Sequence, residues 1–148
     1  MSEVDHTERF EISAESESET KTTVAARGFE FTIDEPAALD GTDDGPTPVE
    51  YLLGAWAGCL NVVAHTVAEE RGIEIDGIDF DIGGDLDPRK LFGVSDDARA
   101  GFQEIRVQLR VASDEGVPAG FVEEVEDRCP VGDNIGNVTP TNVSVEIS

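Results

Sequence analysis

A long apolar segment with clear signals at its two ends most constrains the fold of this chain. Thr47 precedes Pro48, and Glu50 lies three residues after the threonine. This arrangement is typical of a helix N-cap with a capping box and a proline in the first turn. At the other end, Gly72 supplies a C-cap signal. The sequence therefore predicts a long helix over residues 48–71.

The first half of this predicted helix is apolar on nearly every side. Such a helix is expected to be buried on most sides. Gly54 and Gly58 stand one turn apart, and each costs about 1 kcal/mol relative to alanine inside a helix. Close packing against another backbone would explain both glycines, and the alternative is that large neighbours need room. The apolar residues are Leu52, Leu53, Ala55, Trp56, Ala57, Cys59, Leu60, Val62 and Val63.

Residues on both sides of the helix alternate between apolar and polar, which predicts strands. Gly83-Gly84 is expected to end the fourth strand, and Arg27-Gly28 to form a tight turn between the second and third. Because strands outnumber helices and do not alternate regularly with them, the pattern indicates an α+β fold rather than a doubly wound sheet. The predicted strands cover residues 8–14, 21–27, 29–33, 73–82, 102–112 and 143–147, and a second, amphipathic helix covers 118–128.

The length of 148 residues predicts one domain, 1–148, in which the denser acids of residues 1–19 form a mobile extension or an edge strand. Thirty-three acidic residues face ten basic ones, and the formal net charge is -23. The acids recur between apolar residues, which indicates an acidic surface on a folded domain rather than a disordered acidic segment. Nucleic acid is excluded as an expected partner, because phosphate binding needs a basic patch.

The sequence contains no run of 18 apolar residues, so we expect no membrane-spanning helix. The acidic N-terminus lacks the apolar run of a signal peptide, and we expect a cytoplasmic protein. Structural disulfides are rare in that compartment, so Cys59 and Cys129 are either inert core residues or redox-active ones. His6 and His65 give them no zinc-ligand spacing, and we expect no metal site.

The residues around each cysteine point to a known family. From Pro48 to Cys59 the chain has a proline, an acid, two leucines, small residues and then the cysteine. This segment resembles the cysteine-bearing helix of the OsmC/Ohr family of peroxide-handling proteins. Arg128-Cys129-Pro130-Val131 is similar to the second-cysteine segment of the same family. The resemblance covers residues 20–148.

The resemblance implies antiparallel sheets packed on a long central helix and a shorter second helix, in an intertwined homodimer. It also implies a thiol-dependent peroxidase that reduces organic hydroperoxides or hydrogen peroxide without a bound cofactor. Cys59 would attack the peroxide and Cys129 would resolve the sulfenic acid, with an external thiol or lipoyl reductant restoring both thiols. A cation must keep the attacking sulfur ionised. Arg27 lies at the turn of the N-terminal hairpin, the region from which the family's arginine comes, and the alternative is an ordinary surface arginine in a turn. Arg128, beside Cys129, is a second candidate.

The acid of the family motif is expected directly after the proline, where this chain has Val49. Glu50, the nearest acid, lies nine residues before Cys59, about 180° around a helix. Glu50 is therefore a candidate catalytic acid or simply a capping residue. The departure leaves two alternatives open, which are a redox-sensing or small-ligand-binding homodimer without efficient peroxidase activity, and a structural dimer with unused cysteines.

The large negative charge predicts a dependence of stability on salt. Like charges repel in the compact state, and molar salt shortens the Debye length to about 3 Å. We therefore expect the melting temperature to rise from dilute buffer to molar KCl, as suits the cytoplasm of a halophilic microbe. Thermal unfolding followed by circular dichroism tests this prediction. A melting temperature that stays flat or falls would favour the alternative, an acidic protein from a low-salt cytoplasm.

Overall fold

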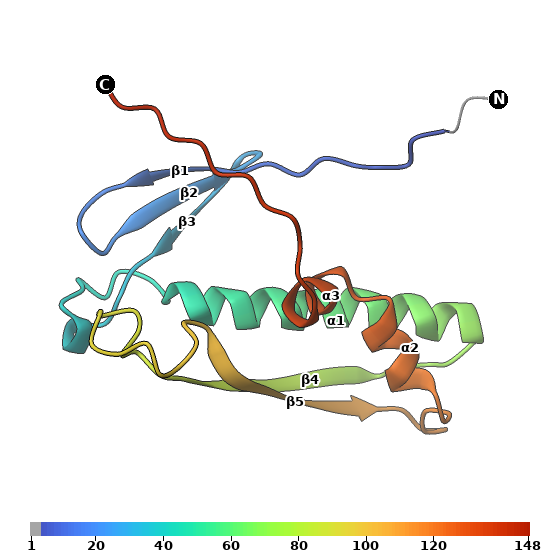
Figure 1. Ribbon diagram of the computed structural model, residues 1–148. Helices are drawn as coiled ribbons and strands as arrows, with labels where there is room; N and C mark the ends of the chain where they lie inside the picture. The colour runs from blue at the N-terminus through green and yellow to red at the C-terminus, as the bar shows by residue number, and fades with distance from the viewer. Residues whose placement is uncertain (1–3) are drawn as a thin grey trace. The chain divides into compact units, whose positions relative to one another are not determined.

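The computed structural model describes residues 4–148, in two compact units that meet in sequence at Leu52 and Leu53. The first unit contains an antiparallel sheet of three strands in the order β1-β2-β3 (Figure 1). Arg27 and Gly28 form the predicted turn between the last two strands. The second and third predicted strands are confirmed, whereas the first lies later than expected. The strands are β1 (Ser13–Ser16), β2 (Thr22–Ala26) and β3 (Phe29–Ile33).

A buried carboxylate organises the loop after β3. The side chain of Asp34 is fully buried. It accepts hydrogen bonds from the hydroxyls of Thr20 (2.8 Å) and Thr42 and from the backbone N–H groups of Glu35 (2.7 Å) and Asp44 (3.1 Å). The Thr42 hydroxyl contributes most to holding the pKa of Asp34 well below its usual range, although burial acts in the opposite direction.

The long helix has the predicted boundaries. A short 3₁₀ turn, η1 (Ala37–Leu39), precedes it, and α1 runs over Pro48–Arg71. The backbone N–H of Thr47 donates to Glu50 Oε1 (2.8 Å), and the backbone N–H of Glu50 donates to Thr47 Oγ1 (3.2 Å). This reciprocal pair is the predicted capping box. Gly72 ends the helix with a φ of 68°, which glycine adopts without strain.

The second unit contains an antiparallel two-stranded ribbon of β4 (Gly77–Leu86) and β5 (Phe102–Ala112). The prediction for β5 is confirmed, but the expectation that Gly83-Gly84 would end its partner strand is wrong. The two strands pair through both glycines. A Cβ atom at Gly84 would stand 2.6 Å from the ring of Phe102. The glycine therefore makes room for an aromatic ring.

The core of the second unit is built on the C-terminal half of α1. The helix α2 (Phe121–Asp127) packs Phe121 and Val125 against this face, and hydrophobic residues of β4 and β5 pack onto the same cluster. By length and composition α1 is apolar enough to cross a membrane, with a mean hydropathy of 1.3, yet its buried residues belong to this core. They are Leu60, Val63, Ala64, Val67 and Ala68.

The expectation that α1 is buried on most sides is wrong for the single chain. Gly54, Ala55, Gly58 and Val62 form an exposed, uncharged face. We call these four residues the small-residue face. A Cβ atom placed on either glycine would meet nothing within 4 Å. No backbone of the described residues packs there, so the single chain does not explain why these positions lack side chains.

The C-terminal part of the chain also differs from the sequence-based expectation. A third helix, α3 (Pro130–Gly136), follows α2 and was not predicted. The predicted strand at residues 143–147 is wrong for the single chain, because this segment pairs with no strand in the described structure. Its apolar side chains are instead 90% (Val143), 78% (Val145) and 92% (Ile147) exposed.

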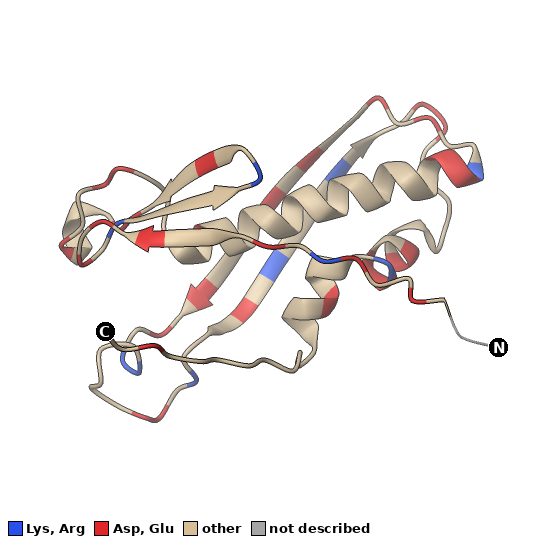
Figure 2. Cartoon of the chain, turned by 90° about the horizontal axis from the view of Figure 1, so that it is seen from above, with Lys and Arg blue, Asp and Glu red and all other residues tan. Residues whose placement is uncertain are grey.

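Acidic side chains occur on strands, loops and helix ends, whereas the middle of α1 carries no charge (Figure 2). On β4 aspartates alternate with apolar residues, and on β5 glutamine, glutamate and arginine do so, as a ribbon with one buried and one solvent-facing side requires. The charge of the chain is therefore spread over its surface, and the apolar helix face stands out against it.

Candidate active site

Cys129 lies between α2 and α3, where it is the N-cap of α3. Its backbone is extended, with φ -83° and ψ 110°, and Pro130 occupies the start of the helix. The backbone N–H of Gly132 donates to the sulfur atom of Cys129 over 3.4 Å. The sulfur thus satisfies one of the N–H groups that a helix start leaves without a partner. A proline directly after a polar residue is an N-terminal helix signal, and it could have predicted α3.

The structure brings Cys59, on α1, together with Cys129 from a distant part of the sequence. Cys129 is 1% exposed within the core cluster, and Cys59 is half-buried against the same cluster as a second free thiol. Burial is the main cause that raises the pKa of the Cys129 thiol. The N–H of Gly132 acts in the opposite direction, and the neighbouring Cys59 thiol raises the pKa further.

Trp56, three residues before Cys59 on α1, completes the surroundings of the thiols. Its indole Nε1 is buried and has no hydrogen-bond partner among the residues that the structure describes. A Cβ atom at Gly132 would stand 3.0 Å from this Nε1 and 3.5 Å from Cys129 Sγ. The absence of a side chain at Gly132 therefore makes room for the indole, whereas the distance to the sulfur is an ordinary van der Waals contact. Gly132 was not predicted as a site residue, because a glycine in the first turn of an unpredicted helix carries no local signal.

An apolar cavity of about 190 Å³ lies beside this group. Two of its walls are the side chains of Trp56 and Leu60, which flank Cys59 in sequence. The remaining walls come from β5 and α2, and one of them carries a charge. The lining residues from these two elements are Val107, Leu109, Val122, Val125 and Glu126. We call this space the α2 cavity.

Arg128, the residue before Cys129, is bound to carboxylates. Its guanidinium donates to both carboxylate oxygens of Glu70 (2.7 and 3.0 Å) and to Glu124 (3.2 Å). Arg71 forms a further ion pair with Glu124. The hydrogen bond to Glu70 is the main cause that raises the pKa of Arg128 above its usual range. The charge of Arg128 is therefore compensated by acids, which argues against it as the cation that activates a thiol.

Arg27, the other predicted cation, lies in the first unit at the turn between β2 and β3. Its backbone adopts a φ of 61°, which is uncommon for a residue with a side chain. The guanidinium lies 5.1 Å from the centre of the Phe29 ring, a cation–π distance. The role of Arg27 toward Cys59 stays a prediction.

Glu50, the predicted catalytic acid, is engaged in the helix cap. The backbone N–H and the hydroxyl of Thr47 bond to it and lower the pKa of its carboxyl group. This carboxylate stabilises the start of α1, as the capping interpretation predicted. A catalytic role for Glu50 stays a prediction.

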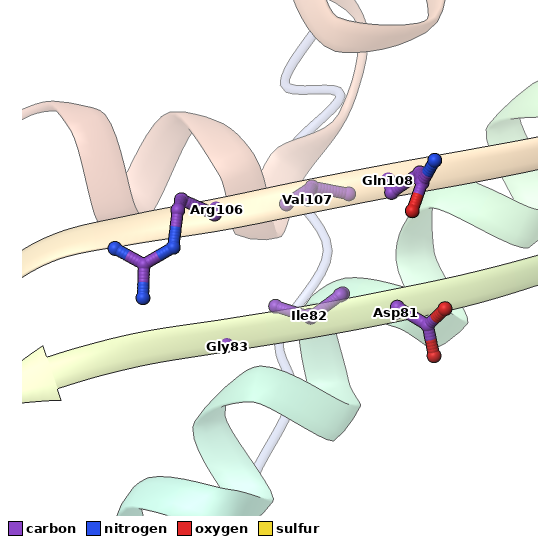
Figure 3. Close-up of a pocket in the computed structure, with 6 residues that line it drawn as sticks. All are labelled: Asp81, Ile82, Gly83, Arg106, Val107 and Gln108. Carbon is purple, nitrogen blue, oxygen red and sulfur yellow. The ribbon is translucent and has the colours of Figure 1, made fainter.

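A second hollow, of about 400 Å³, lies on the ribbon of β4 and β5 and contains no thiol among its lining residues (Figure 3). Figure 3 shows Arg106 and Asp81 at its two ends. Arg106 is paired with Asp85 (2.7 Å), and Asp81 is paired with Arg110 (2.6 Å). Because these charges compensate each other along the ribbon, we interpret the hollow as a solvent-facing surface between ion pairs.

The unequal surroundings of the two cysteines predict unequal alkylation. Thiolates react with iodoacetamide, so the buried Cys129, with its raised pKa, should react at least about tenfold more slowly than Cys59 at neutral pH. Its reaction should also need a higher pH than that of a free thiol. Peptide mapping by mass spectrometry after timed alkylation measures both rates, with the unfolded chain in urea as the control. Equal rates in the folded protein would contradict this description of the site.

Comparison with family models identifies the family of this chain, and solved structures share its fold. A family model described as OsmC-like protein matches residues 41–144. Comparison with curated proteins gave no sequence match. Among solved structures, an OsmC-like protein from Mycoplasma pneumoniae is 22% identical, with a TM-score of 0.76 over 88% of this chain and 89% of that one.

Two further solved structures carry names that mention hydroperoxides. An organic hydroperoxide resistance protein OsmC from Legionella pneumophila is 14% identical, with a TM-score of 0.64 over 88% of this chain and 91% of that one. The organic hydroperoxide resistance protein OhrB of Bacillus subtilis is 21% identical, with a TM-score of 0.56 over 85% and 89%. These likenesses show a shared α+β fold. With the family model matching most of its length, the chain belongs to the OsmC-like protein family.

Proposed function

We propose that this protein is a thiol-dependent peroxidase that reduces organic hydroperoxides or hydrogen peroxide through Cys59 and Cys129. The observation that supports the proposal most strongly is the approach of the two thiols within one apolar cluster. Relatives of the same fold are named for resistance to organic hydroperoxides. We place the activity in the cytoplasm, where thiol reductants are abundant.

The difference in exposure between the two cysteines supports the roles that we propose for them. Cys59 is half-buried and accessible, so its thiolate attacks one peroxide oxygen and breaks the O–O bond. The alkoxide leaves and takes up a proton, and Cys59 becomes a sulfenic acid. The buried Cys129 thiol then attacks the Cys59 sulfur, which releases water and forms a disulfide. An external dithiol, such as a lipoyl group, reduces this disulfide by exchange and restores both thiols.

The proposal assigns to Arg27 the cation that keeps Cys59 ionised. The charge of Arg128 is compensated by Glu70 and Glu124, so the part of the chain around Cys129 offers a poor alternative. A positive group near a thiol favours the thiolate. Glu50 is assigned the capping role that its hydrogen bonds show, and a catalytic role for it would require this cap to open.

The alternative function is a redox-sensing or small-ligand-binding homodimer with slow peroxide chemistry. Two observations favour it: Val49 stands where the resemblance places an acid, and burial disfavours ionisation of Cys129. The same two thiols would then form a disulfide slowly in response to oxidants. The rate of turnover separates this function from that of an enzyme.

Peroxide turnover with matched variants tests the proposal. The wild type should consume cumene hydroperoxide with dihydrolipoamide, and Cys59→Ser should lower kcat/KM by at least about 100-fold because the nucleophile is lost. Cys129→Ser should still react once with peroxide, but it should stop as a sulfenic acid that a dimedone probe detects. Mass spectrometry of the oxidised wild type should find a Cys59–Cys129 disulfide. Equal rates for the wild type and Cys59→Ser would exclude the enzyme.

We propose further that the protein works as a homodimer. The small-residue face of α1 lets another backbone approach closely, and the apolar residues at 143–147 have no partner in the single chain. Light scattering should therefore give the mass of two chains. Gly54→Leu should reduce this to one chain without loss of helical signal, because leucine favours the helix but fills the contact face. A wild type that remains a single chain at high concentration would refute the dimer.

A further inference from the structure

The α2 cavity lies beside the thiol group and is small and mostly apolar. Leu60 and Val125 are buried at its base, and Trp56 is shared with the group around Cys129. Its volume of about 190 Å³ is smaller than the 300–1,000 Å³ typical of sites for drug-sized molecules. A single aromatic ring or a short branched alkyl group matches its size and its apolar lining.

One charged side chain, Glu126, lines this otherwise apolar space. The neighbouring acid Glu124 is paired with Arg71 and Arg128, and Glu70 shares Arg128 with it. Glu126 has no ion-pair partner in the part of the chain that the structure describes. Its negative charge at the cavity is therefore uncompensated, and it repels an anionic group on a ligand that enters the cavity.

The cavity borders the thiol group through Trp56. The indole ring lines the cavity, while its Nε1 side meets Gly132 next to the Cys129 sulfur. Leu60 is the residue after Cys59 on α1 and lines the same cavity. Neither cysteine lines the cavity itself, so the two residues through which it adjoins the thiols are Trp56 and Leu60.

We infer that Glu126 is a specificity-determining residue, which makes the α2 cavity accept the hydrocarbon part of small neutral hydroperoxides and reject those that carry a carboxylate. The inference rests on the proposed function for the reacting group, but the selective binding itself does not require turnover. The physical cause is repulsion between two negative charges at close range, within the Debye length of about 8 Å at physiological ionic strength, so the repulsion acts although Glu126 itself is exposed. The apolar lining residues attract the hydrocarbon part of both kinds of hydroperoxide. The charge of Glu126 therefore decides which of the two binds.

The chain contains one tryptophan, Trp56, so its fluorescence reports directly on the cavity. The probes are cumyl alcohol, which is the product expected from cumene hydroperoxide, and the same alcohol with a para-carboxylate. The wild type should bind the neutral alcohol at least about tenfold more tightly than the carboxylate. Glu126→Gln should reduce this ratio by about fivefold or more.

Glu123→Gln is the matched control. It removes the same charge from a position on α2 that is exposed, as Glu126 is, but does not line the cavity, and it should leave the ratio of the two affinities within about twofold of the wild-type value. This control separates the local charge from the large net charge of the chain. Thermal melts of both variants establish that they are folded.

Three results would overturn the inference: neither alcohol changes the fluorescence, both bind equally to the wild type, or Glu126→Gln leaves their ratio unchanged. A cavity filled by a second copy of the chain would give the first of these results. Turnover of cumene hydroperoxide is measured separately on the same samples. Selective binding without turnover would refute the peroxidase and support the cavity assignment, whereas turnover without selectivity would do the reverse.

Discussion

Burial of one face of α1 is the constraint on which the second unit depends. The face from Leu60 to Ala68 packs with Phe121 and Val125 of α2 and with the inner side of the β4–β5 ribbon. Fully burying side chains of this size contributes about 1.5–3 kcal/mol each. The same packing determines the position of Cys59, because the cysteine lies one residue before the first buried leucine and projects beside the cluster rather than away from it.

This packing affects the chemistry of the two thiols in opposite ways. A dry apolar cluster excludes water from a sulfenic acid, but it also raises the pKa of Cys129 and so disfavours its thiolate. Arg128, the residue before Cys129, does not relieve this, because its charge is paired with Glu70 on α1 and Glu124 on α2. An activating positive charge has to come from elsewhere, as from Arg27 in our proposal.

Local signals predicted the parts of the structure whose cause is local. The capping box at Thr47 and Glu50 and the glycine at position 72 give the bounds of α1, and the alternation over Phe102–Ala112 gives β5. Where the cause lies far away in the sequence, prediction failed. Gly84 was predicted to end a strand, because Phe102, whose ring occupies the space of a side chain at this position, is distant in the sequence.

The candidate site also has features that the sequence predicted and features that it did not. The two cysteines were recognised from the residues around them, and the structure brings them together. Gly132 and the α2 cavity were not foreseen, because they depend on how α3, α2 and β5 pack around Trp56. The segment 143–147 has the alternation of a strand but no partner within the single chain, and alternation alone does not reveal which chain supplies the neighbour.

The cradle of donors around Asp34 has a consequence for how the first unit responds to acid. Ordinary carboxylates take up protons near pH 4, and on a chain with 33 acids this relieves self-repulsion as the pH falls. Asp34 keeps its charge at a lower pH because its folded pKa is depressed. Its stabilising contribution declines as the pH falls below the ordinary carboxyl pKa, and it is fully lost only below the folded pKa. The loop that leads into α1 therefore remains bonded in a mildly acidic medium that has already neutralised much of the surface.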